Sequence, residues 1–155
     1  MHNKFLNNKI ILVTGASGFI GSMVMEYLEK CDVKIVAFTR KRIIPLNENK
    51  SINYESGDIA HDSVWKNLFL KYKFDYIFHL AALEYQGLNG NVLMDLEINV
   101  KSNLILLDSI KLLSNKPKII YFSSVNVFGS IISKNVTEES NPKPESYWSN
   151  HKLLS

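Results

Sequence analysis

The sequence is poor in the features that mark several classes of protein. A single cysteine among 155 residues, Cys31, excludes an intramolecular disulfide and suits a reducing cytoplasm. The net charge of +3 is too small to indicate a nucleic-acid partner or an anionic membrane surface. No apolar run is long enough to span a bilayer, and the N-terminus lacks the pattern of a signal peptide. We therefore expect a cytoplasmic globular domain with no nucleic-acid or membrane partner.

Three glycines follow the first apolar run of the chain. Gly15 and Gly18 lie between residues 10–13, which have the pattern of a strand, and a helical pattern that starts at residue 19, and Gly21 falls in the first turn of that pattern. A strand-to-helix turn of this kind holds a dinucleotide pyrophosphate. The first glycine permits the tight turn, the second lets the backbone approach the phosphates, and the third lets the helix pack close to the strand. The free N–H groups of the helix N-terminus then face the anion.

Apolar runs and helical periods alternate along the chain. Strands are predicted at 9–14, 33–38, 51–55, 76–80 and 119–122, and helices at 19–31, 61–72, 91–113 and from about 145 onward. This alternation implies βαβ units and a parallel sheet with helices on both faces. Right-handed crossovers then predict an α/β, Rossmann-like doubly wound sheet of about five strands in the order 3-2-1-4-5. In the helix at 91–113 the apolar residues recur at spacings of three and four: Leu93, Leu96, Val100, Leu104 and Leu107.

Ligands of doubly wound sheets lie beyond the carboxyl ends of the strands. After the second strand, Thr39 and Arg40 occupy the place where a carboxylate would favour NAD, so we expect NADP with its 2′-phosphate on these two residues. A solvated basic loop is the alternative. After the third strand, Asp58 and Ile59 could hold an adenine, or Asp58 could cap the next helix.

The ends of the fourth and fifth strands carry small and polar residues. Ala81 and Ala82 would let a cofactor lie against the backbone, and His79 is expected to satisfy a local hydrogen bond. Asn99, within the long helix, is expected to brace the nearby backbone. Ser124 follows the fifth strand, where its hydroxyl can bond a substrate alcohol or carbonyl.

Together these motifs resemble the extended short-chain dehydrogenase/reductase superfamily, and most of all its NAD(P)-dependent nucleotide-sugar epimerases and dehydratases. The similarity covers nearly the whole chain, from the TGxxGxxG pattern at 14–21 to the strand-five segment at 122–129. The resemblance implies a dinucleotide site and no metal, with Ser124 in the position of the catalytic Ser or Thr. The cofactor residues it implies are Gly15, Ser17, Gly18, Phe19, Ile20, Gly21, Thr39, Arg40, Asp58, Ile59, Leu80, Ala81, Ala82, Asn99 and Lys152.

The sequence departs from this family at a catalytic position. The family places Tyr and Lys four residues apart on a helix, a turn of about 400°, so that both side chains share a face. Here Tyr147 and Lys152 are five residues apart, and Trp148 lies four before Lys152. Either Trp148 replaces the tyrosine, or Tyr147 acts from an irregular helix start. In the family the tyrosine moves a proton at the sugar hydroxyl, while the lysine lowers the tyrosine pKa and holds the ribose.

Family members are longer and carry a C-terminal substrate domain. We therefore expect residues 1–155 to form the dinucleotide-binding domain alone, with an exposed apolar flank near the fifth strand and last helix that could support a homodimer. Two functions remain open. One is the NAD(P)-binding portion of an epimerase/dehydratase-like oxidoreductase that transfers a hydride at a sugar carbon, with Ser124, Tyr147 and Lys152 as catalytic residues and no activity in the isolated chain. The other is a non-catalytic dinucleotide-binding module.

Overall fold

The computed structural model describes residues 4–42, 49–84, 90–130 and 135–155. Its strands are β1 (Lys9–Thr14), β2 (Val33–Thr39), β3 (Ile52–Ser56), β4 (Tyr76–His79) and β5 (Lys118–Tyr121). Its helices are α1 (Phe19–Leu28), α2 (Asp62–Lys71), α3 (Val92–Leu96), the π-helix η3 (Glu97–Lys101), α4 (Ser102–Lys111) and α5 (Tyr147–Leu154), with short 3-10 turns η1 (Lys4–Leu6) and η4 (Val125–Phe128). Among the residues so described, no helix has the length and apolar character needed to cross a membrane.

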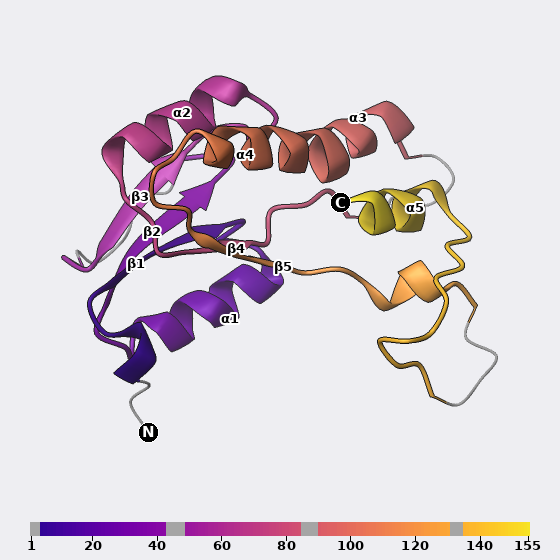
Figure 1. Cartoon of the computed structure of the whole chain (residues 1–155), viewed down its shortest axis with the longest axis horizontal. Coiled ribbons are helices and arrows are strands. Elements are labelled where there is room, and N and C mark those ends of the chain that lie inside the picture. The colour runs from indigo at the N-terminus through magenta and orange to yellow at the C-terminus, as the bar shows by residue number, and fades with distance from the viewer. Residues whose placement is uncertain (1–3, 43–48, 85–89, 131–134) are drawn as a thin grey trace. The chain divides into compact units, whose positions relative to one another are not determined.

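The chain divides into two compact units. The first unit comprises residues 1–81 and 105–121, and the second comprises 82–104 and 122–155. The sheet belongs to the first unit and has the strand order β3-β2-β1-β4-β5, with every neighbouring pair parallel. Helix α1 covers one face of the sheet, whereas α2 and the later part of α4 cover the other (Figure 1). The predicted doubly wound order is therefore confirmed.

The two central strands form the core of the first unit. Ile11 and Val13 of β1 and Ile35 of β2 are buried because helices cover both faces of a parallel sheet. Helix α1 adds Met25 and Leu28 to this core. Full burial of one leucine side chain contributes about 2 kcal/mol to the free energy of unfolding. The packing of α1 on the sheet therefore stabilises the first unit.

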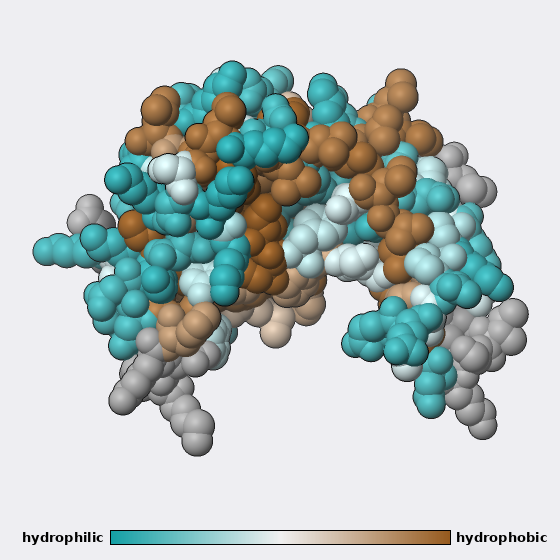
Figure 2. All heavy atoms as spheres, in the orientation of Figure 1, coloured by the Kyte–Doolittle hydropathy of each residue, from teal (hydrophilic) through white to brown (hydrophobic). Residues whose placement is uncertain are grey.

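The predicted helix at 91–113 is divided into α3, the π-helical turn η3 and α4. Its apolar stripe is not its buried face, because most of the large aliphatic residues on it are exposed: Leu93, Leu96, Leu104 and Leu107. Figure 2 shows such hydrophobic residues at the surface over α3. The buried residues of this segment include polar ones: Asp95, Asn99, Ser102 and Asn103. Buried polar groups need hydrogen-bond partners, and these partners define the site described next.

Candidate functional site

The glycine turn joins β1 to α1 and leaves no room for side chains. Gly15 has a φ of +67°, in the left-handed region, and a Cβ there would lie 2.8 Å from the Ala81 nitrogen. A Cβ on Gly21 would overlap the carbonyl oxygen of Gly15. Gly18 is the N-cap of α1, so no side chain caps this helix, and its first turn carries no acidic residue. The turn thus combines a close backbone cradle with a helix N-terminus suited to an anion.

Thr14 fixes the backbone that follows β4 beside this turn. The amides of Leu80 and Ala81 both donate to Thr14 Oγ1 at 3.1 Å, and the same oxygen lies 2.8 Å from His79 Nδ1. Thr14 Oγ1 thus accepts from two backbone amides and pairs with one imidazole nitrogen of His79. His79 therefore satisfies the predicted local hydrogen bond. Thr14 is the first residue of the glycine pattern, but its role as an acceptor for the backbone after β4 was not predicted from the sequence.

The residues expected to bind a 2′-phosphate lie at the end of β2. Thr39 is buried, and its hydroxyl donates to the Lys41 carbonyl at 2.6 Å. Arg40 is exposed. The hydroxyl proton of Thr39 is therefore used in a hydrogen bond to the backbone. Of the two residues, Arg40 is the one whose side chain is accessible to a ligand.

Asp58 and Ile59 follow β3 and precede α2. One carboxylate oxygen of Asp58 accepts from the Ala60 amide at 2.9 Å, which makes a tight turn. The N-cap of α2 is His61, not Asp58, and Ile59 is buried. Asp58 thus stabilises the turn that precedes α2 but does not cap the helix.

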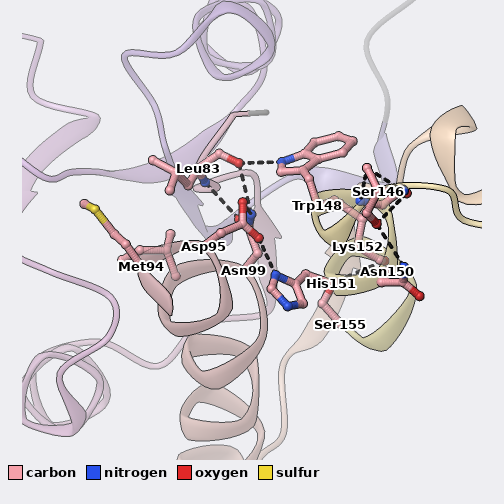
Figure 3. Close-up of polar contacts among 12 residues, drawn as sticks. Leu83, Met94, Asp95, Asn99, Ser146, Trp148, Asn150, His151, Lys152 and Ser155 are labelled. Atoms are coloured by element: carbon pink, nitrogen blue, oxygen red, sulfur yellow. Dashed lines mark hydrogen bonds and ion pairs between the residues drawn. The ribbon is translucent and has the colours of Figure 1, made fainter. Parts of the chain in front are cut away.

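In the second unit, two side chains converge on the backbone of Leu83. Asn99 accepts from the Leu83 amide at 2.8 Å and donates to the Leu83 carbonyl at 3.0 Å. Trp148 Nε1 donates to the same carbonyl at 2.8 Å (Figure 3). Asn99 therefore braces the backbone as predicted, and the indole of Trp148 is directed at the protein's own main chain.

A buried carboxylate–imidazole contact joins α3 to α5. Asp95 Oδ1 lies 2.6 Å from His151 Nδ1, and Asp95 Oδ2 accepts from Asn99 at 3.0 Å (Figure 3). Asp95 is 1% exposed and His151 8% exposed. Asp95 therefore uses both carboxylate oxygens, one with the His151 imidazole and one with the Asn99 amide. Neither Asp95 nor His151 belongs to a motif that would have predicted this contact from the sequence.

The three expected catalytic residues all lie in the second unit. Ser124 is the N-cap residue before η4, and its Oγ accepts from the Asn126 amide at 3.2 Å. Tyr147 is the first residue of α5, which starts with a regular capping box from Ser146. Lys152 is buried on this helix. Because α5 is regular, five residues separate Tyr147 and Lys152 by roughly 140° around its axis.

A parallel sheet of this order, with a glycine turn after β1, defines a Rossmann fold of the dinucleotide-binding type. The chain belongs to the NAD dependent epimerase/dehydratase family, whose model matches residues 11–155.

Curated relatives match over most of the chain. A CDP-paratose 2-epimerase from Salmonella typhi is 30% identical over 129 residues, which cover 78% of this chain and 38% of that protein. A UDP-glucose 4-epimerase from Caenorhabditis elegans is 30% identical over 148 residues, which cover 84% of this chain and 42% of that protein. The chain therefore spans less than half the length of these relatives.

Solved structures share the fold. An ADP-L-glycero-D-manno-heptose-6-epimerase from Helicobacter pylori superposes with a TM-score of 0.79 at 29% identity, covering 97% of this chain and 50% of that one. An epimerase from Methanothermobacter thermautotrophicus gives 0.83 at 28% identity, covering 97% and 46%. A UDP-glucose 4-epimerase from Bifidobacterium longum, solved with NAD+ and UDP, gives 0.78 at 23% identity, covers 94% and 46%, and shows the common fold alone.

Proposed function

We propose that this chain is the dinucleotide-binding portion of an NAD(P)-dependent nucleotide-sugar epimerase or dehydratase. The observation that carries the proposal is the glycine turn, where Gly15 and Gly21 exclude side chains beside an uncapped helix N-terminus. Family membership supports the cofactor class, and the printed activities of the relatives support a sugar nucleotide as substrate.

The proposed roles of the cofactor residues concern each unit by itself. In the first unit, the N-terminus of α1 binds the pyrophosphate, and the backbone at Leu80 and Ala81, fixed by Thr14, lies against the cofactor. In the second unit, Lys152 holds the nicotinamide ribose. When bound, the nicotinamide would supply a hydride acceptor and donor for a sugar carbon, and Ser124 would orient the sugar hydroxyl.

The proposed acid/base is Tyr147, but one observation favours a second function. Trp148 occupies the position four before Lys152, and an indole N–H is neither a usable acid nor a usable base. Its donor is also bonded to the Leu83 carbonyl. A non-catalytic dinucleotide-binding module is therefore the second candidate. Conversion of a sugar nucleotide that Tyr147→Phe abolishes would exclude that module.

We propose NADP as the preferred cofactor, because Arg40 is an exposed guanidinium at the end of β2 and no carboxylate stands there. Titration of the chain with NADH and NADPH, followed by the fluorescence of the reduced nicotinamide, tests both claims. We expect saturable binding, tighter for NADPH. A folded chain that binds neither dinucleotide would overturn the proposed function, and equal affinities would overturn the preference alone.

We also propose a homodimer. Leu93 and Leu96 of α3 and Leu154 of α5 are exposed large aliphatic residues, all in the second unit. Exposed apolar patches of this kind mark protein contacts. Sedimentation equilibrium should show a dimer that Leu93→Glu dissociates. A wild-type chain that stays monomeric at high concentration would contradict this.

A further inference from the structure

Asp95 and His151 lie beside the residues that the proposed function assigns to the cofactor. Asp95 bonds Asn99 through one carboxylate oxygen and His151 through the other. His151 directly precedes Lys152 on α5. One buried carboxylate thus connects the helix that carries Asn99 with the helix that carries Lys152 (Figure 3).

Two hydrogen bonds hold α5, and both start from side chains on the same face of this helix. His151 bonds Asp95, and Trp148, three residues earlier, bonds the Leu83 carbonyl that Asn99 also uses. Residues three apart lie on one face of a helix, about one turn from each other. A helix fixed at two such points can neither slide along its axis nor rotate about it. Lys152 then projects at a set angle, about 100° around the axis from His151.

We propose that Asp95 and His151 are positioning residues that set Lys152 for the nicotinamide ribose, an inference that rests on the proposed function. The pair acts through the register of α5 and does not touch the cofactor. Loss of the imidazole leaves a buried carboxylate with one donor fewer, so α5 gains freedom where Lys152 must be fixed. The effect should fall on the nicotinamide half of the cofactor and not on the half held by the glycine turn.

The test compares NADPH with ADP, which lacks the nicotinamide half. In His151→Ala we expect NADPH to bind about tenfold more weakly, as for loss of a buried hydrogen bond to a charged group, while ADP binds as in the wild type. His151→Asn places an amide donor near the position of Nδ1 and should restore most of the NADPH affinity. Glu97→Gln is the matched control, because Glu97 is an exposed carboxylate on the adjoining turn that pairs with Lys101.

A second measurement follows Lys152 without any cofactor. Labelling with acetic anhydride, read by peptide mass spectrometry, gives the reaction rate of Lys152 relative to that of exposed Lys66. This ratio should rise in His151→Ala and return toward the wild-type ratio in His151→Asn. If the wild type binds neither NADPH nor ADP, the proposed function fails while the labelling still decides whether the pair positions Lys152.

Three results would overturn the inference. Equal NADPH affinity in wild type and His151→Ala would show that the pair positions nothing. An equal loss of NADPH and ADP binding would show that it only maintains the fold. An unchanged labelling ratio for Lys152 would show that α5 keeps its register without the imidazole.

Discussion

The glycine turn and helix α5 reach their positions by different means. At the glycine turn the backbone itself fills the space, and a side chain on Gly15 or Gly21 would meet main-chain atoms. Helix α5 is held by side chains whose partners are distant in sequence: His151 lies 56 residues from Asp95, and Trp148 lies 65 from Leu83. A cradle made of backbone is specified by a short local motif. A helix held by buried polar contacts depends on pairs of residues that lie far apart in the sequence.

The largest expected effect falls on the backbone cradle. Gly21→Ala should lower the free energy of unfolding by about 3 kcal/mol, although alanine is the better helix former, because its Cβ would overlap the Gly15 carbonyl oxygen. NADPH binding should be lost with it. Urea unfolding and nicotinamide fluorescence measure the two effects.

Gly57→Ala is the control for this substitution. A Cβ on Gly57 would lie 3.0 Å from a methyl group of Val64, a side chain that can move. We expect a change below about 1 kcal/mol and unaltered cofactor binding. If Gly21→Ala were tolerated as well as Gly57→Ala, the backbone around Gly21 would not be closely packed.

The next effect contrasts a buried carboxylate with a partly exposed one. Asp95→Asn should cost about 2 kcal/mol, because an amide presents one acceptor where Asp95 receives two donors, from His151 and Asn99. Asp75, which accepts from the Ile10 amide and from Lys9, is 29% exposed, and Asp75→Asn should cost about 1 kcal/mol. Urea unfolding of both variants measures the two losses of unfolding free energy. A larger loss for Asp75→Asn than for Asp95→Asn would contradict the argument that the buried carboxylate contributes more to stability.

The fold was predictable from sequence because its signals are local. Mostly apolar runs of four to six residues locate every strand but β3, where only Ile52 and Tyr54 carry the signal. The glycine pattern with its flanking elements indicates the sheet order. The position of Asn99 was predictable for a similar reason, since an amide within an apolar helix needs backbone partners. These features follow from a few neighbouring residues and from the geometry of parallel sheets.

The polar site of the second unit was not predictable in the same way. Leu93, Leu96 and Leu104 recur at the spacing of an apolar helix face, yet these residues are exposed and Asp95 is buried. Periodicity detects an apolar stripe but does not say which partner covers it. The partner of Asp95 is His151, on another element, and no short pattern links the two residues. The π-helical turn at Glu97–Lys101 has no sequence signature either.

The pH dependence of the unfolding free energy tests the contribution of Asp75, the partly exposed carboxylate. Partial burial pushes the pKa of Asp75 upward, but hydrogen bonds from the Ile10 amide and Lys9 outweigh it and hold this pKa below its ordinary value. A lowered pKa in the folded state stabilises the protein above the unfolded-state value of about 4, and this contribution is lost as pH falls through the folded-state pKa. The difference in unfolding free energy between wild type and Asp75→Asn should therefore be constant near neutrality and shrink below about pH 4. A difference that grew on acidification would contradict this sign.

The smallest expected effect is on cofactor affinity and concerns Arg40, an exposed residue directly after β2 in the first unit. If its guanidinium pairs with a 2′-phosphate, Arg40→Ala should weaken NADPH binding about fivefold and leave NADH binding unchanged. The effect is modest because an exposed ion pair is screened, so it should shrink further in high salt. Lys30→Ala is the control, since Lys30 is an exposed cation just after the C-terminal end of α1 that pairs with Glu26. Should Arg40→Ala weaken NADH and NADPH alike, Arg40 would act as a general attraction for anions, and the end of β2 would not discriminate between the two cofactors. The glycine turn would not discriminate between the two cofactors either, because NADH and NADPH share the same pyrophosphate.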